Sequence, residues 1–234
     1  MREDAEDRLG KRRGLVHLII GILVFGSLWG FFEATLGGFL NMIIFPNKGA
    51  IMSGIGVAIM GGALAIYRKP SMLPGIGIVA ASFKLLNVWF LFVPIGAVHV
   101  INPAMAIILE SLAFSLVAAF LMKRIAKNAT VGIGAGILVG LVSATAYVYF
   151  AIHAMNAPLF ERMGVSSIGG FIANQGMVQA VFFGILLPLG YLAGEKISAR
   201  TLSVSTSRPL YYATSAAVIC LCWVISAVVV MLGF

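Results

Sequence analysis

Three ionisable side chains lie inside long apolar stretches of this chain, where a charge is costly. Glu33, Lys84 and Glu110 are each surrounded by glycine and apolar residues. Because an unpaired charge at membrane depth costs several kcal/mol, such residues face protein or a water-filled cavity and mark functional sites. We expect Lys84 to pair with one glutamate, while the other is protonated or binds a cationic or hydrogen-bonding group. The alternative is a buried ion pair that only fixes helix packing.

Uncharged polar side chains extend this set. Asn87 follows Lys84 by three residues, so both lie on one face of a helix. Gln175 and Gln179 are four residues apart and place two amides on one face of another helix. Each amide offers donors and an acceptor, which suits an uncharged polar ligand. Such amides serve equally well as hydrogen bonds between helices.

Further polar residues lie near the ends of apolar segments. Tyr149, His153 and Asn156 follow one another at helical spacing, and His99 and Asn102 flank the start of another segment. They predict a polar mouth on the outer side. The candidate substrate-binding residues are Glu33, Lys84, Asn87, Asn102, Glu110, His153, Gln175 and Gln179.

The chain lacks the motifs of common catalytic and metal sites. It contains no His-Glu-x-x-His, no Gly-x-Ser-x-Gly and no phosphate-binding Gly-Lys-Ser/Thr loop. Its three histidines have no ligand spacing with the glutamates, so neither a metal nor a haem is expected. Cys220 and Cys222, two residues apart on a helix, do not face each other. We therefore predict no enzyme activity, no catalytic residues and no cofactor.

The elements that hold these residues are expected to be membrane-spanning helices. The 234 residues are 61% hydrophobic and 10% charged, against about 45–50% and about 25% in soluble domains. A span needs about 20 mostly apolar residues. By that measure the sequence predicts an all-α, polytopic membrane protein in the lipid bilayer with about seven transmembrane helices. They cover residues 15–43, 50–67, 72–95, 101–122, 131–153, 168–194 and 210–233.

The basic residues predict the orientation of the helices. Beyond the charged segment 1–13, most of them fall in connections on one side: Arg68, Lys69, Lys123, Arg124, Lys127, Lys196, Arg200 and Arg208. Only Lys48 and Arg162 fall on the other side. Because cytoplasmic loops are enriched in Lys and Arg, segment 1–13 is expected in the cytoplasm and the C-terminus outside. The same rule explains the net charge of +8 without nucleic acid. Residues 14–234 then form a single multi-pass domain in the inner cell membrane.

The two halves of the chain resemble each other in sequence. Residues 15–95 and 101–194 each contain an embedded glutamate, a four-step ladder of small residues and a Pro-x-Gly. With three spans in each half, the halves have opposite topology, as in the inverted repeats of secondary transporters. The helix at 210–233 is then an addition. The alternative is that small residues recur only because they let helices pack closely.

A small-residue seam at Gly26, Gly30 and Ala34 supports a resemblance to a known family. With the small, basic, loop-poor chain, it resembles the membrane substrate-binding (S) subunits of energy-coupling factor transporters. That resemblance implies that the seam docks on a transmembrane partner subunit. The seventh segment and the embedded charges depart from the family's pattern.

These patterns lead to one main hypothesis and two alternatives. The main hypothesis is an integral membrane transport protein that binds a small polar solute or ion in a cavity lined by Glu33, Lys84 and Glu110. The first alternative is a non-transporting subunit that anchors or assembles a larger complex. The second is a proton-coupled secondary transporter, in which Glu33 and Glu110 titrate as a coupled pair.

Overall fold

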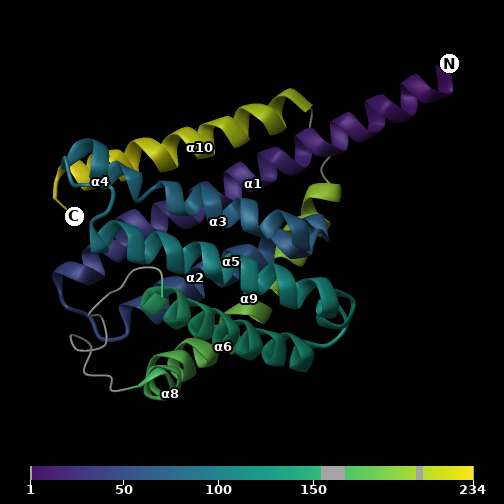
Figure 1. Ribbon diagram of the computed structural model, residues 1–234. Helices are drawn as coiled ribbons and strands as arrows, with labels where there is room; N and C mark the ends of the chain where they lie inside the picture. The colour runs from purple at the N-terminus through teal and green to yellow at the C-terminus, as the bar shows by residue number, and fades with distance from the viewer. Residues whose placement is uncertain (1, 154–166, 204–207, 234) are drawn as a thin grey trace.

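The computed structural model describes residues 2–153, 167–203 and 208–233, which are helical apart from short connections (Figure 1). Seven helical segments in these ranges are long and apolar enough to cross a membrane, which confirms the prediction of an all-helical fold with about seven helices of that length. Asn156 and Arg162, used in the sequence interpretation, lie outside the described residues. The elements are α1 (Arg2–Met42), α2 (Lys48–Tyr67), η1 (Pro70–Met72), α3 (Leu73–Ser82), α4 (Leu85–Phe90), α5 (Val98–Ile125), α6 (Ala129–His153), α8 (Ile168–Phe171), η2 (Ile172–Gly176), α9 (Met177–Ser203) and α10 (Arg208–Met231).

The helices run side by side, and their connections gather at two ends of the bundle (Figure 1). One end holds the α1–α2 connection, residues 43–47, the α4–α5 connection, residues 91–97, and the end of α10. We call it the Phe45 end. The chain begins at the opposite end.

Helix α9 is held closely by two neighbours because glycines remove side chains at the crossings. A Cβ atom on Gly190 of α9 would lie 2.0 Å from the carbonyl oxygen of Ala58 on α2. One on Gly136 of α6 would lie 2.2 Å from the carbonyl oxygen of Phe183 on α9. Small residues at such positions let helix backbones approach each other. The two small-residue ladders predicted from the sequence therefore both pack against α9.

The small-residue seam of α1 is an internal contact. A Cβ atom on Gly26 would meet Val79 of α3 at 2.5 Å, and one on Gly30 would meet the ring of Phe83 at 2.2 Å. Ala34 packs against the cluster formed by Phe83 and residues of α10. In this structure the seam predicted to dock a partner subunit is thus covered by the chain's own α3 and α10.

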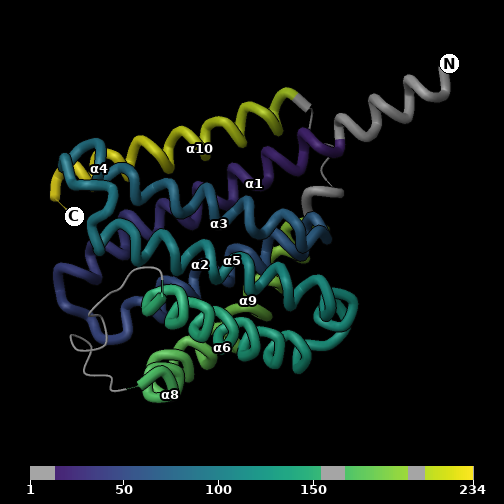
Figure 2. Tube along the Cα trace, viewed as in Figure 1, coloured from purple at the N-terminus to yellow at the C-terminus, as the bar shows by residue number. Residues whose placement is uncertain are grey.

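The third span is interrupted at Phe83 and Lys84. The backbone N–H groups of these two residues bond to the carbonyls of Ala80 and Ala81, three residues back, rather than four. The backbone then continues as α4, which lies beside the end of α10 (Figure 2). Helix α4 ends at Phe90, so the prediction of one uninterrupted helix to residue 95 is wrong at its end and at this break.

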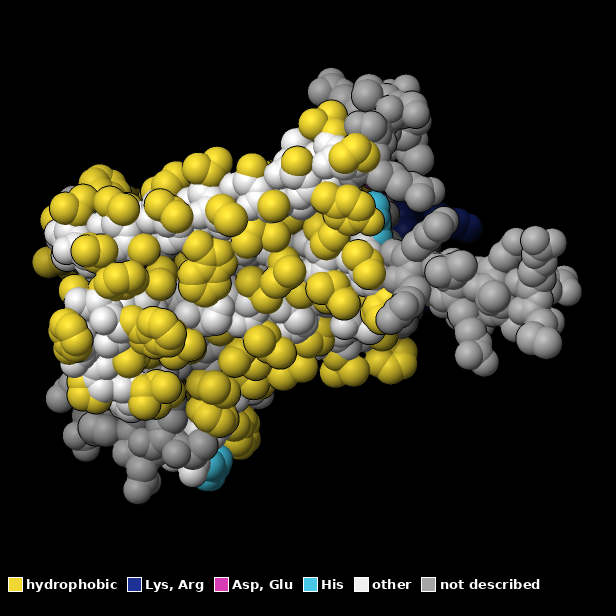
Figure 3. Space-filling view, turned by 90° about the horizontal axis from the view of Figure 1, so that it is seen from above, with side chains coloured by type: hydrophobic (Ala, Val, Ile, Leu, Met, Phe, Trp, Pro, Cys, Tyr) yellow, Lys and Arg dark blue, Asp and Glu magenta, His cyan; other side chains and the backbone are white. Residues whose placement is uncertain are grey.

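The outer surface is apolar along the helices. Figure 3 shows hydrophobic side chains over most of the visible face, with histidine and basic side chains only near the ends. Large exposed residues such as Leu116 and Phe120 of α5 and Val181 of α9 contribute to this surface. This surface suits lipid and leaves the polar chemistry of the described residues to the interior.

Candidate functional site

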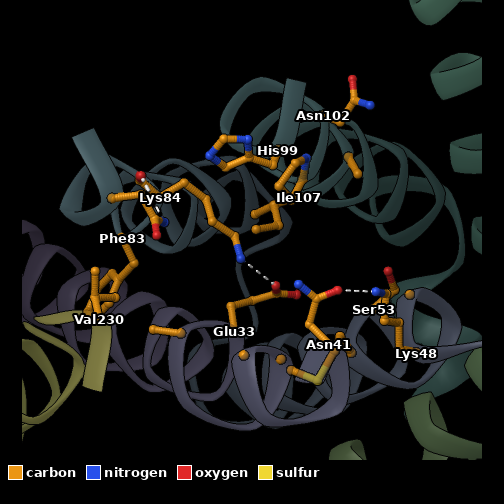
Figure 4. Close-up of a pocket in the computed structure, with 18 residues that line it drawn as sticks. Glu33, Asn41, Lys48, Ser53, Phe83, Lys84, His99, Asn102, Ile107 and Val230 are labelled. Atoms are coloured by element: carbon orange, nitrogen blue, oxygen red, sulfur yellow. Dashed lines mark hydrogen bonds and ion pairs between the residues drawn. The ribbon is translucent and has the colours of Figure 1, made fainter. Parts of the chain in front are cut away.

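A cavity of about 550 Å³ lies inside the bundle, toward the Phe45 end (Figure 4). Residues of α1, α2, α4, α5 and α10 line it. The ionisable side chains among them are Glu33, Lys48, Lys84 and His99. With neutral histidine, the described lining has two ammonium groups and one carboxylate, and so a surplus of positive charge.

Glu33 and Lys84 form an ion pair across this cavity. The Lys84 Nζ atom lies 3.1 Å from Glu33 Oε2, and the two side chains point toward each other in Figure 4. Glu33 is only 8% exposed. Helix packing accounts for the pair: Phe83 packs against Gly30, one turn before Glu33, and the break in the span places Lys84 next to it. The sequence predicted a lysine–glutamate pair, and the structure identifies Glu33 as the partner.

Amides occupy other parts of the cavity wall. Lys48 donates a hydrogen bond to Asn41 Oδ1, so this lysine is held at the Phe45 end of the cavity. Asn87 Nδ2 donates to the Lys84 carbonyl at 3.4 Å, which ties it to the broken turn. The wall therefore offers charged donors and amides within one space.

Glu110 belongs to a second, smaller cavity of about 200 Å³. Its Oε1 atom accepts a hydrogen bond from Ser53 Oγ at 2.5 Å and another from Gln179 Nε2 at 3.0 Å. The same amide donates to Ser143 Oγ at 3.3 Å. Glu110 is 3% exposed, and its Oε2 atom has no hydrogen-bond partner among the described residues.

The two cavities share part of their walls. Ser53, Asn102, Pro103 and Ala106 border both, so the cavities are neighbours. Asn102 Oδ1 is buried and, like Glu110 Oε2, has no partner among the described residues. The two chambers are thus adjacent polar regions inside the bundle.

Seven of the eight candidate residues line these chambers. Glu33, Lys84 and Asn87 border the larger one; Glu110, Gln175 and Gln179 border the smaller one; Asn102 borders both. His153 is exposed at the end of α6, with its ring stacked 6.0 Å from that of Tyr149, and is not among the residues that line either chamber. The prediction that Glu33, Lys84 and Glu110 line one cavity stays a prediction: Glu110 lines the chamber next to that of Glu33 and Lys84, and the two chambers share part of their walls.

Sequence reasoning missed Ser53, Ser143 and the contribution of Lys48. A lone serine in an apolar helix commonly bonds its own backbone, so its residue type gives no sign of a site. Ser53 does precede Gly54, which packs against Leu186 of α9. That position is the only signal that would have selected it.

The short helix α8 and α9 are joined by a π-helical turn, η2, beside the smaller chamber. Gln175 lies in this turn, between Phe171 and Gln179, which also line the chamber. Single π-helical turns inside α-helices are frequent at functional sites.

Comparison of the chain with models of protein families, with curated proteins and with solved structures finds no match. Function is therefore inferred from the two chambers themselves.

Proposed function

We propose that the chain is a multi-pass membrane transport protein that binds a small polar solute in the larger chamber. The observation that carries this proposal is a cavity of about 550 Å³ built around a buried ion pair, Glu33 with Lys84. Ligand pockets of about 300–1,000 Å³ are typical of small-molecule sites. Charged residues within membrane helices are expensive to keep and usually line a substrate or ion pathway.

The lining favours a solute with an anionic group. Lys48 and Lys84 bring two ammonium groups to the chamber, and Glu33 neutralises one of them. Lys84 has three donors and uses one on Glu33, so others remain for a carboxylate or a similar group. The amides of Asn41, Asn87 and Asn102 supply further donors and acceptors for the rest of the molecule.

The solute enters from the Phe45 end. Asn41 and His99 line the chamber and are exposed, so the chamber reaches the surface there. The distribution of lysine and arginine predicts that this end lies outside the cell and that the N-terminus lies in the cytoplasm, with the protein in the inner membrane. The broken third span supports this proposal, since interrupted helices form the binding sites of many transporters.

The energy source separates two versions of the proposal. Uptake by the protein alone in liposomes under an imposed pH gradient supports a proton-coupled secondary transporter. Uptake that needs ATP and added partner subunits supports a substrate-binding subunit of the energy-coupling factor type, whose partner would have to dock elsewhere than on the covered Gly26 seam.

Thermal unfolding of the detergent-purified protein against a panel of small carboxylates, amino acids, vitamins and nucleobases tests the proposal. Glu33→Gln removes the carboxylate of the chamber. Glu195→Gln is the matched control, because Glu195 also pairs with a basic residue, Arg68, but is exposed and lines neither chamber. A bound solute at 100 times its Kd stabilises the fold by about 2.7 kcal/mol.

We expect one class of solute to raise the Tm of the wild type and of Glu195→Gln, each relative to its own baseline, but not that of Glu33→Gln. If no solute in the panel shifts any of the three proteins, the non-transporting, complex-assembling subunit becomes the better account.

A further inference from the structure

We propose that the smaller chamber is a second site, which binds a monovalent cation through Glu110. Two sources share this chemistry: an inorganic ion such as Na⁺, or the ammonium group of an amine. The inference concerns a site separate from the solute site around Glu33, and it does not depend on that site.

The first observation is a pair of buried oxygens without partners. Glu110 Oε2 and Asn102 Oδ1 are both buried and both lack a hydrogen bond among the described residues. Both residues line the smaller chamber. Buried polar atoms in proteins nearly always have a partner, and two acceptors cannot satisfy each other. What is missing is therefore a donor or a positive charge.

The second observation is how Glu110 is bonded. Its Oε1 atom accepts from a serine hydroxyl and from a glutamine amide, two donors that favour the ionised form of the carboxyl group. Of the described residues that line this chamber, none is Lys, Arg or His, and Glu110 is the one acidic residue. Lys84, in the neighbouring chamber, is paired with Glu33. A cation in the smaller chamber would compensate the negative charge that burial makes costly.

The donor set identifies the kind of cation. Carboxylate, amide and hydroxyl oxygens are ligands for hard cations rather than for transition metals. The described residues contain no group of three or more His, Cys, Asp or Glu side chains that could hold a metal ion. One carboxylate among neutral oxygens matches a single positive charge.

The shape of the chamber fits both sources of that charge. A volume of about 200 Å³ has room for an ion with some of its water, since water occupies about 30 Å³ per molecule in the liquid. Tyr147 and Phe171, whose ring centroids are 6.1 Å apart, also line the chamber. Aromatic faces attract ammonium groups, so an amine is equally well accommodated. Gln175, which also lines the chamber, lies in a π-helical turn, and such turns are frequent at functional sites.

The position of the site connects it to the solute chamber. Ser53 and Asn102 border both cavities, so a cation at Glu110 lies directly behind the shared wall. A cation and an anionic solute in adjacent chambers would attract each other.

Thermal unfolding in chloride salts at constant ionic strength tests the proposal without any solute. The wild type is compared in NaCl, KCl and NH₄Cl against choline chloride, whose bulky cation serves as the reference. Glu110→Gln and Asn102→Ala alter the site, whereas Glu195→Gln makes the same chemical change as Glu110→Gln at a glutamate outside both chambers.

We expect at least one small cation to raise the Tm of the wild type by several degrees over choline, with saturation as its concentration rises. Glu195→Gln should keep this response, Glu110→Gln should lose it, and Asn102→Ala should need at least about tenfold more cation. A response to NaCl identifies an inorganic ion, and a response to NH₄Cl alone identifies an ammonium group.

The proposal is overturned if all four salts give the same Tm, or if Glu110→Gln responds like the wild type. Should Glu110→Gln fail to fold, an unchanged response of Asn102→Ala overturns it as well. A Tm shift caused by a solute in choline chloride is a separate result. The absence of a cation response therefore does not contradict the solute site, and the absence of a solute response does not contradict the cation site.

Discussion

Two glutamates of similar sequence context have different roles at the level of single residues. Glu33 is neutralised by Lys84, whereas Glu110 accepts hydrogen bonds from Ser53 and Gln179 and has one oxygen without a partner among the described residues. The sequence predicted that the lysine would serve only one glutamate. It could not predict which one, because the choice depends on how Gly30 lets Phe83 approach α1.

Removing one partner of the Glu33–Lys84 ion pair should destabilise the protein more than removing both partners. Glu33→Gln leaves the Lys84 ammonium buried without its counter-charge, and we expect it to lower the free energy of unfolding by about 3 kcal/mol. The double variant with Lys84→Met removes both charges and should lie within about 1 kcal/mol of the wild type. Unfolding in mixed micelles measures both. If the single and the double variant lose the same free energy of unfolding, the loss does not come from an unpaired Lys84 charge.

The hydroxyl of Ser53 should stabilise the fold more than an ordinary buried hydroxyl. Ser53→Ala removes a donor to the Glu110 carboxylate and should cost about 2 kcal/mol. Ser115→Ala is the control, because Ser115 donates to the neutral carbonyl of Pro70, and it should cost about 1 kcal/mol. The same unfolding assay compares them. A smaller loss for Ser53→Ala than for Ser115→Ala would contradict an ionised Glu110.

At the level of elements, both chambers lie where a helix departs from regular α geometry. Lys84 lies at the break between α3 and α4, and Gln175 lies in the π-helical turn before α9. Neither irregularity was predicted, since no proline or turn motif interrupts the stretches 81–87 or 171–177. Both stretches are compatible with a regular helix. The irregularities arise from the packing of the whole bundle, which a single sequence does not reveal.

The glycine crossings were predictable as a pattern, and they give a sharp test of the packing. Gly190→Ala would place a Cβ atom 2.0 Å from the Ala58 carbonyl oxygen, so we expect it to cost about 3 kcal/mol or to prevent folding. Gly134→Ala, on α6, meets nothing within 4 Å and should be neutral or stabilise by up to about 1 kcal/mol. Yield and unfolding in detergent measure both. Similar behaviour of the two variants would contradict the close α2–α9 contact.

At the level of the whole molecule, the number of spans was well predicted because hydropathy over about 20 residues is a strong signal. The division of the polar residues into two chambers was not predicted, because it depends on which helices become neighbours. The inverted repeat stays a prediction, as does the orientation in the membrane.

Cysteine labelling in intact cells tests the orientation. With Cys220 and Cys222 replaced by alanine, Gly96→Cys in the α4–α5 connection and Ala129→Cys at the start of α6 each add one exposed thiol, at opposite ends of the bundle. We expect a membrane-impermeant maleimide to label Gly96→Cys and to spare Ala129→Cys until the cells are opened. The reverse pattern would place the N-terminus outside and the larger chamber toward the cytoplasm.

The central claim, that the buried charges face a water-filled chamber rather than a dry helix contact, is tested most directly by a cysteine in the chamber wall. In the same background, Ala106→Cys lies on the wall shared by both chambers, and Ala119→Cys lies exposed on the same helix, toward lipid. We expect the small water-soluble reagent methanethiosulfonate ethylammonium, added outside, to modify Ala106→Cys and not Ala119→Cys. An unreactive Ala106→Cys in a folded protein would contradict the account, and Glu33 and Lys84 would then serve packing alone.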